Sequence, residues 1–213
     1  MVSTVMGTLK RIFFYSWGPR LEHVLRNMLL TTLTYPEATF LELMHLLHIS
    51  KEEQIALTNK LEDPVLKQFW KIFPYSERLR YELVSSTLNK VSPFLDDLMM
   101  RNIVGQTDNT IDFKQVMDDG KILFVDLSKG KIGDANSDLL GSVIVNLILI
   151  AALKRKDTAE EKRLPFHLIV DEFQNFATES FTVLQSEARK YAVDTVVAHQ
   201  FRDQLDDISK GST

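Results

Sequence analysis

The segment from Phe166 to Gln174 constrains the fold of this chain more than any other. A run of apolar and β-branched residues ends abruptly in two adjacent carboxylates, Asp171 and Glu172, which aromatic and amide residues follow. Such a run is typical of a buried strand in a parallel sheet, and open α/β sheets bind ligands in the crevice at the carboxyl ends of their strands. The acidic pair is therefore expected at such a crevice. The alternative is a strand that ends in a solvated acidic turn.

Two adjacent carboxylates in this position have a specific use in nucleotide hydrolysis. The first carboxylate can hold the Mg²⁺ of a nucleotide, and the second can polarise the attacking water. In this sequence the two groups are Asp171 and Glu172. The pair thus indicates one half of a nucleotide site if the strand reading is correct.

Composition sets outer bounds on the protein. A chain of 213 residues with 45% hydrophobic and 25% charged residues is globular and forms one large domain or two small ones. It contains no cysteine, which excludes disulfides and thiolate metal sites. A net charge of −4 argues against a strongly basic nucleic-acid surface. The longest apolar run, Leu139–Leu153, contains Ser142 and Asn146; it is too short to span a bilayer and is expected to be a core helix.

Residues 20–100 show helical periodicity throughout. Gly18-Pro19 is expected to open the first helix, Ser50–Glu53 has the form of a capping box, and Asp63-Pro64 opens another helix. Ser76 is expected to cap the last helix, which ends before Pro93. An all-helical block of five or six short helices is therefore predicted. Its expected apolar stripes are Leu21, Val24, Leu25, Met28 and Leu29; Phe40, Leu43, Met44 and Leu47; Val65, Leu66, Phe69, Trp70 and Phe73; and Leu79, Leu83, Leu88 and Val91.

After residue 100 the pattern changes to alternating strands and helices. Strands are predicted at 121–127, 166–171 and 194–198, with helices at 137–155, capped by Asp134 or Asn136, and at 179–191. This order implies a parallel sheet with right-handed crossovers.

The three predicted strands all end in polar residues. Asp126, the pair Asp171-Glu172 and Gln200 would then lie along one edge of the sheet. An amide both donates and accepts hydrogen bonds, so Gln200 could contact a γ-phosphate or orient water. The alternative is that Gln200 caps the following helix.

The phosphate-binding loop G-x-x-x-x-G-K-[ST] does not occur in this sequence. Gly120-Lys121 and Gly130-Lys131 are each followed by isoleucine and lack the earlier glycine. Without a glycine-rich nest and its lysine, the chain cannot hold a triphosphate in the usual way. The sequence therefore indicates the carboxyl-terminal half of a nucleotide hydrolase whose phosphate-binding strand and loop lie upstream.

Several segments together resemble the HerA/FtsK superfamily of P-loop ATPases, and within it the TraG/TraD-like coupling proteins of conjugation and type IV secretion. The resemblance covers nearly the whole chain. It is carried by Trp17–Glu22, Arg101–Gln106, Gly120–Gly130, Leu168–Phe176, Ser186–Tyr191 and Ala198–Gln200.

The resemblance implies a RecA-like α/β motor domain with an inserted all-α subdomain. Residues 1–19 would be a helix of the motor core, 20–100 the helical subdomain, and 101–213 the RecA-like part with the Walker B strand. Asp171 would then hold Mg²⁺, while Glu172, Gln200 and an arginine finger, Arg189, would act on ATP. The alternative for Arg189 is a solvated helix-end charge or a pair with Glu187 or Asp194.

In such proteins a homohexamer uses ATP to translocate DNA, in the cytoplasm or at the cytoplasmic face of the membrane through a segment not present here. Enzymatic activity in this chain would require an upstream Walker A segment. One alternative is a non-catalytic interaction module that docks relaxosome or secretion-system proteins. A second is a nucleic-acid-binding regulator, against which the balance of 11 basic and 11 acidic side chains over residues 1–100 counts.

Overall fold

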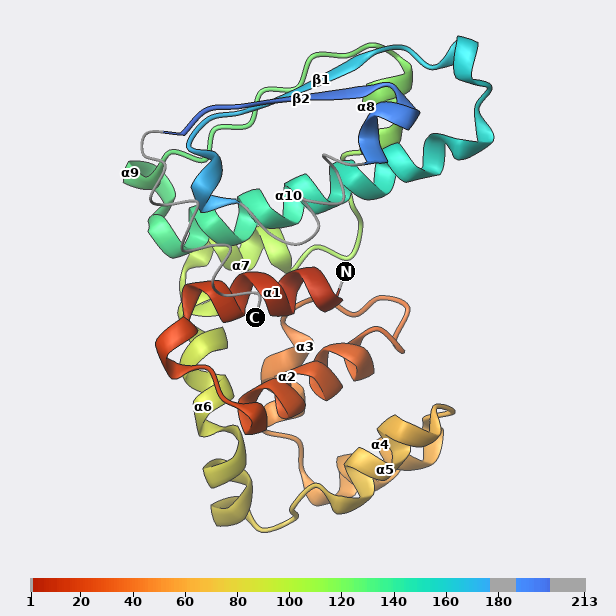
Figure 1. The fold of residues 1–213 in the computed structure, drawn as a ribbon. Helices are drawn as coiled ribbons and strands as arrows, with labels where there is room; N and C mark the ends of the chain where they lie inside the picture. The colour runs from red at the N-terminus through yellow and green to blue at the C-terminus, as the bar shows by residue number, and fades with distance from the viewer. Residues whose placement is uncertain (1, 177–186, 200–213) are drawn as a thin grey trace. The chain divides into compact units, whose positions relative to one another are not determined.

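A computed structural model describes residues 2–176 and 187–199, which fall into two compact units (Figure 1). The helical unit comprises residues 9–109. The α/β unit comprises residues 3–8 together with the described residues from 110 onward. Helix α1 (Val2–Ile12) spans the boundary near residue 8. The described chain is mostly helical with a small parallel sheet, and each unit has its own core.

Helices α2 (Pro19–Thr32), α4 (Lys51–Lys60) and α5 (Pro64–Ile72) begin where local sequence signals place their first turns. Ser76 precedes α6 (Glu77–Asp96), but its side chain does not form the predicted cap. Pro19 occupies the first turn of α2, Ser50 and Glu53 form the expected capping box of α4, and the Asp63 carboxylate accepts hydrogen bonds from two amides of α5. Each cap satisfies backbone N–H groups that have no partner inside the helix. The elements are η1 (Phe14–Ser16), α2 (Pro19–Thr32), α3 (Glu42–Leu47), α4 (Lys51–Lys60), α5 (Pro64–Ile72), α6 (Glu77–Asp96) and α7 (Leu98–Val104).

A buried polar network holds α4, α5 and α6 together. The Gln54 side-chain amide donates to the carbonyls of Trp70 and Phe73, both at 2.8 Å, and its oxygen accepts from Arg80 at 3.0 Å. Trp70 in turn donates its indole N–H to the Thr31 hydroxyl at 2.9 Å. All of these side chains are buried. The network therefore satisfies the carbonyls at the end of α5 inside the core.

Helix α6 departs from its predicted pattern in two ways. Its buried face includes Val84, Val91 and Phe94, so the predicted stripe is confirmed at Val91. At Leu79 the prediction was wrong, because that side chain is exposed. The helix also continues through Pro93 to Asp96. Proline has no N–H to donate to the Asn89 carbonyl, four residues earlier in the helix. Pro93 and Asn89 are both exposed, so this hydrogen bond is lost on the solvent side of the helix.

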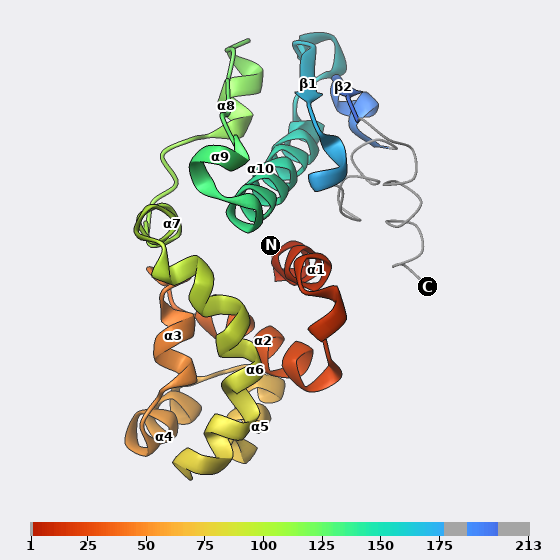
Figure 2. The ribbon, with the colours of Figure 1, turned by 90° about the vertical axis from the view of Figure 1, so that its left-hand side faces the viewer.

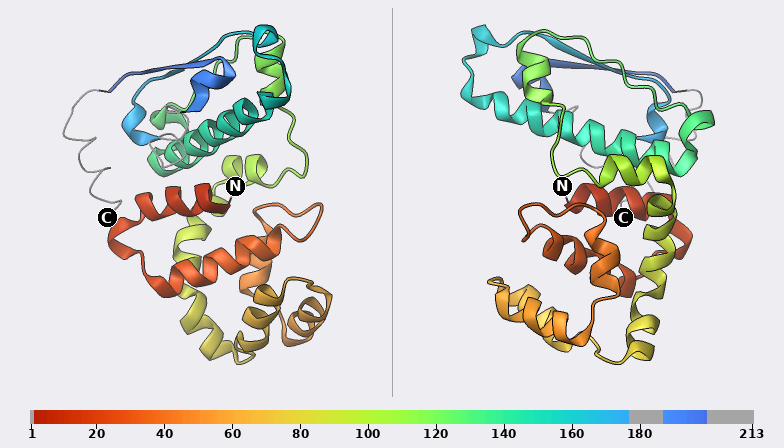
Figure 3. Two further views of the ribbon diagram at one scale, coloured as in Figure 1. Left: turned by 45° about the vertical axis from the view of Figure 1, so that its right-hand side comes forward. Right: turned by 180° about the vertical axis from the view of Figure 1, so that it is seen from behind.

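The α/β unit is built on one long helix and a parallel strand pair. The strands β1 (Phe166–Val170) and β2 (Val193–Val197) pair in parallel from Phe166↔Val193 to Val170↔Val197. Figure 3 shows both strands running along α10 (Asp134–Lys154), and Figure 2 shows the strand pair beside that helix. The remaining elements are α8 (Phe113–Asp118), α9 (Lys129–Ile132), η2 (Arg155–Asp157), η3 (Glu160–Lys162), η4 (Phe173–Asn175) and η5 (Ala188–Tyr191).

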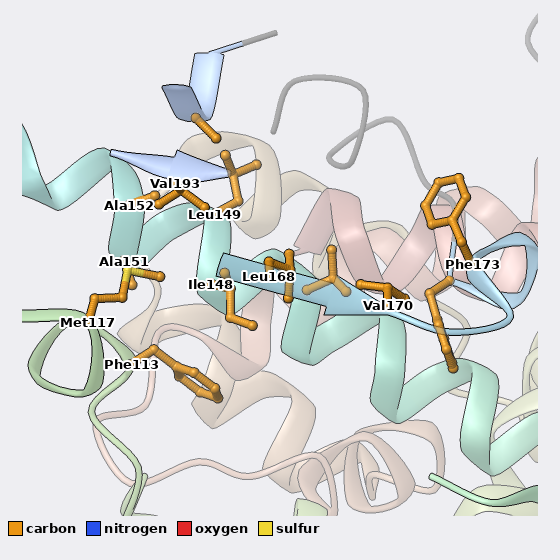
Figure 4. Close-up of a cluster of buried hydrophobic side chains, with 13 residues drawn as sticks. Phe113, Met117, Ile148, Leu149, Ala151, Ala152, Leu168, Val170, Phe173 and Val193 are labelled. Carbon is orange, nitrogen blue, oxygen red and sulfur yellow. The ribbon is translucent and has the colours of Figure 1, made fainter. Parts of the chain in front are cut away.

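One face of the strand pair packs on α10 and the other is open to solvent. Leu168 and Val170 of β1 lie in one buried cluster with Ile148 and Leu149 of α10 (Figure 4). Strand residues alternate between faces, and Ile169 on the opposite face is 73% exposed. The sheet therefore buries one apolar face within the described residues.

The prediction of a strand at residues 121–127 was wrong. Residues 121–128 form neither helix nor strand, and Ile122 and Phe124 are exposed, while only Leu123 and Leu127 pack against the core. Asp126 is drawn into a local turn, where its carboxylate accepts from the Ser128 amide at 3.0 Å and pairs with Lys131. The Lys131 hydrogen bond, followed by that of Ser128, lowers the pKa of Asp126 to about 2. Asp126 therefore does not end a strand beside Asp171.

Helix α10 begins differently from the prediction. Its N-cap is Gly133 with φ 82°, so neither Asp134 nor Asn136 caps it with a side chain. Within the described residues, Asp134–Asp157 is the one stretch that could cross a membrane by its length and composition. This stretch is longer than the apolar run Leu139–Leu153 that the sequence shows. More than half of its most apolar window is buried inside the fold. It is the core helix of the α/β unit, as predicted.

The guanidinium of Arg155 ties together the segments that follow and precede α10. It is fully buried and donates to the Asp118 carboxylate of α8 at 3.0 Å, to the Leu164 carbonyl at 2.6 Å and to the Tyr191 carbonyl at 2.9 Å. Charged groups are seldom buried to this degree unless they are paired and hydrogen-bonded. Arg155 therefore fixes the entry to β1 and the entry to β2 against the end of the core helix.

We expect Arg155→Ala to destabilise the α/β unit by about 3 kcal/mol, because it removes three charge-assisted hydrogen bonds of a buried guanidinium and leaves Asp118 without this partner. Urea unfolding followed by circular dichroism measures the loss. The neighbouring Lys156→Ala removes the same charge from an exposed site and should change the stability by about 0.5 kcal/mol or less. Equal effects of the two substitutions would contradict this role for Arg155.

Candidate functional site

The acidic pair lies at the carboxyl end of β1, as predicted. Val170 is the last residue of the strand and is buried, whereas Asp171 is exposed. The ladder continues for one further bond, because the Ala198 amide donates to the Val170 carbonyl at 2.9 Å. Asp171 and Glu172 therefore sit at the edge of the sheet where both parallel strands end.

Glu172 adopts a left-handed backbone conformation, with φ 48° and ψ 42°. A non-glycine residue in this region costs about 1–2 kcal/mol, and such strain concentrates at functional sites. Its amide donates to Asp171 Oδ1 at 2.8 Å, and its Oε2 accepts from the Asn175 side-chain amide at 3.1 Å. The turn therefore holds both carboxylates in defined positions.

Buried aromatic residues anchor this turn to the rest of the unit. The Phe173 amide donates to the Ala198 carbonyl at 2.9 Å, which links the turn to the end of β2. Phe176 packs so closely on α10 that a Cβ placed on Gly141 would lie 2.2 Å from its ring. Only glycine fits at that position. The sequence offered one signal for this contact, a glycine inside an apolar helix, which sequence analysis did not use.

Arg189 lies on η5, directly before β2, with an exposed side chain. Glu187, one partner considered for it, accepts instead from Lys190 at 2.7 Å, and this bond raises the pKa of Lys190. The other, Asp194, lies 3.5 Å from His167. Arg189 forms no ion pair within residues 2–176 and 187–199. The predicted helix that would carry it lies mostly outside the described residues.

Two other arginines hold the turn that carries Arg189. Arg155 donates to the Tyr191 carbonyl, and Arg163 donates to the Lys190 carbonyl at 2.5 Å. The Arg163 guanidinium also lies 5.7 Å from the centre of the Tyr191 ring, within the range of a cation–π contact. Neither arginine was assigned to the site from the sequence. Their partners are backbone carbonyls distant in sequence, which no local pattern indicates.

Gln200 lies outside the described residues, so its predicted position beside the acidic pair is untested. The described part of this strand end stops at His199, after the Ala198 contacts to both the strand and the turn. Of the four predicted site residues, the structure places Asp171 and Glu172 together at the sheet edge. It places Arg189 at the opposite end of the neighbouring strand, before Val193.

The chemistry of the acidic pair suits a hard divalent cation. Mg²⁺ prefers oxygen ligands and is commonly bound by one or two carboxylates plus substrate phosphates and water. Asp171 is an exposed carboxylate of this kind, already oriented by the Glu172 amide. The described residues contain no cluster of three histidine or acidic side chains that would bind a metal by themselves. Within the described residues, the acidic pair therefore supplies part of a metal site and does not complete one.

Comparison of the chain with protein-family models, with curated proteins and with solved structures found no match.

We expect Ala192→Gly to stabilise the α/β unit by about 1 kcal/mol, because Ala192, with φ 57°, is strained in the same way as Glu172. Glu172→Gly should also stabilise the fold, but by a smaller free energy, because it removes the hydrogen bond from Asn175. Ala159, with φ −55°, is an exposed alanine in an ordinary conformation, so Ala159→Gly should destabilise by roughly 0.5 kcal/mol. Urea unfolding compares the three. Strain at Glu172 would be disproved if its glycine variant behaved like Ala159→Gly.

Proposed function

We propose that the α/β unit is the hydrolytic half of a RecA-like P-loop ATPase of the HerA/FtsK type. The observation that supports this most is the acidic pair in a strained turn at the carboxyl end of a parallel strand. Solvated acidic turns do not need a left-handed glutamate, and strain of this kind persists only where the surrounding structure enforces it. Phe173 and Phe176 provide that enforcement from the core.

The two carboxylates have distinct roles in this proposal. Asp171 binds Mg²⁺, which neutralises charge on the nucleotide phosphates when it is bound. Glu172 orients the attacking water and accepts its proton. The hydrogen bond from Asn175 fixes the direction of the Glu172 carboxylate, so the group is positioned before the nucleotide arrives.

The proposed activity depends on residues beyond those of this sequence. A phosphate-binding loop must be supplied by another segment, because none of the 213 residues form one. A RecA-like core covers both faces of its sheet, so the proposal requires that Ile169 and Val196, which are exposed, be covered in the complete motor. We place the complete motor in the cytoplasm or at the cytoplasmic face of the membrane, as a homohexamer that translocates DNA.

Arg189 would act in this assembly as an arginine finger on the nucleotide of a neighbouring subunit. Its exposed guanidinium lies on a turn that Arg155 and Arg163 hold through backbone carbonyls. A fixed cation of this kind stabilises charge that develops on the transferred phosphoryl group.

A second candidate function belongs to the helical unit. Its separate core, its internal polar network and an open groove on α3 and α4 favour a protein-interaction module. In the context of conjugation or secretion, its partners would be relaxosome or secretion-system proteins. This role does not require hydrolysis, so the two functions can be tested separately.

Glu172→Gln is expected to lower ATP turnover by roughly 100-fold or more while nucleotide binding persists, because the amide cannot accept the proton of water. The measurement is phosphate release, with and without DNA, by the chain co-expressed with an upstream segment that carries the phosphate loop. The chain alone should show no turnover above background. Glu161→Gln, at an exposed acidic position on η3, is the control. Normal turnover in Glu172→Gln would refute the assignment.

Arg189→Ala should lower turnover of the same assembly by roughly 1,000-fold, the usual effect of losing an arginine finger. If the residue acts in trans, mixing Arg189→Ala with Glu172→Gln subunits restores part of the activity, because some interfaces then contain both intact residues. Lys190→Ala removes the adjacent, Glu187-paired cation and should leave turnover nearly unchanged. Full activity of the Arg189 variant, or no recovery on mixing, would show that the finger assignment is wrong.

A further inference from the structure

The helical unit contains a groove of about 760 Å³ between the α2–α3 loop, α3 and α4. Leu46, Ile49 and Leu57 form its floor and also belong to the core of the unit. Tyr35 and Pro36 of the loop form a third wall. The groove is large enough for several side chains of a ligand.

The two helical walls follow from one sequence pattern used twice. On α3 and the residues after it, Glu42, His45, Leu46 and Ile49 line the groove; on α4, Glu53, Ala56, Leu57 and Lys60 do so. Both sets have the spacing i, i+3, i+4, i+7, which defines one face of a helix. Ala56 is exposed and small, and it leaves the space between the walls open. The α4 wall is about 10 Å long, since each residue of a helix rises 1.5 Å.

The charges around this groove are unbalanced. Its rim carries Glu37, Glu42 and Glu53, against a single lysine, Lys60. His45 lies 3.9 Å from Glu53 across the two walls. The other oxygen of Glu53 accepts from the Ser50 amide, and this capping-box bond is the main cause that lowers its pKa. An apolar floor below an acidic rim favours a ligand that is apolar at its centre and positively charged at its ends.

We infer that this groove binds a short segment of a partner protein in which one or two large apolar side chains are flanked by lysine or arginine. The apolar side chains would fill the space above Leu46, Ile49 and Leu57, while the basic residues would face Glu37 and Glu42. This is the arrangement by which amphipathic segments bind hydrophobic grooves. DNA and anionic lipid surfaces are disfavoured, because their phosphates would face the same glutamates.

The inference extends the interaction role of the helical unit and is independent of the nucleotide site. The residues that line the groove all lie between Tyr35 and Lys60, within the helical unit. Failure of the binding test would therefore leave the hydrolysis proposal unaffected, and loss of hydrolysis in Glu172→Gln would say nothing about the groove.

The test starts from a display library of short random peptides selected on the full chain. Selected peptides should be enriched in large apolar residues flanked by lysine or arginine. The best of them, made synthetically with a fluorescent label, is then titrated by fluorescence anisotropy beside a counterpart in which glutamate replaces every basic residue. The basic peptide should bind more weakly as salt is raised, and the acidic counterpart should bind at least roughly tenfold more weakly.

Two variants change the groove in different ways. Ala56→Phe fills it, and the double variant Glu37→Gln/Glu42→Gln removes rim charge without touching the capping residue Glu53; each should raise the Kd roughly tenfold or more. The matched controls are Asn59→Phe and Glu52→Gln/Glu62→Gln, at exposed positions outside the groove. These controls should bind as the unaltered chain does.

Several outcomes would overturn the inference. They are selection of acidic peptides, no enrichment at all, and binding that neither groove variant weakens. A fourth is concentration-dependent dimerisation of the chain that Ala56→Phe abolishes, because it would assign the groove to a second copy. If Ala56→Phe does not fold, as judged by circular dichroism, the double glutamate variant and its control decide the question.

Discussion

A single buried cation, Arg155, organises the α/β unit. Its guanidinium bonds to α8, to the segment before β1 and to the turn before β2, so it sets where both strands begin relative to the end of α10. A guanidinium has five donors in a rigid plane, which suits it to hold several backbone carbonyls at fixed directions. The packing of β1 and β2 on α10 buries apolar surface of all three elements, while Arg155 fixes which segments meet.

The helical unit also satisfies backbone carbonyls with side chains from other helices, here an amide and a guanidinium. Gln54 and Arg80, both buried, donate to carbonyls at and just beyond the end of α5. Short helices expose many unpaired backbone groups relative to their length, so a unit made of them depends on such partners. The same unit carries the groove with an acidic rim on α3 and α4.

In the candidate site, the local sequence pattern determines where the acidic pair lies, and tertiary packing determines its backbone conformation. The position of Asp171 and Glu172 after a strand was predictable, because a buried apolar run that ends in two charges must emerge from the core there. The left-handed turn was not, since a glutamate has no intrinsic preference for that conformation. Contacts from Phe173 and Phe176, and the space left by Gly141, impose it.

The sequence by itself determined the starts of α2, α4 and α5, the helical character of residues 20–100, the core helix α10 and the strands β1 and β2. Caps, helical periodicity and apolar runs act over a few residues, so they can be recognised without knowledge of the fold. Only the tertiary structure decided that residues 121–127 form no strand, that α6 continues past Pro93, and that Arg155 and Arg163 support the turn carrying Arg189. Pairing, burial and long-range hydrogen bonds depend on partners distant in the chain, and those partners are set by packing rather than by local sequence.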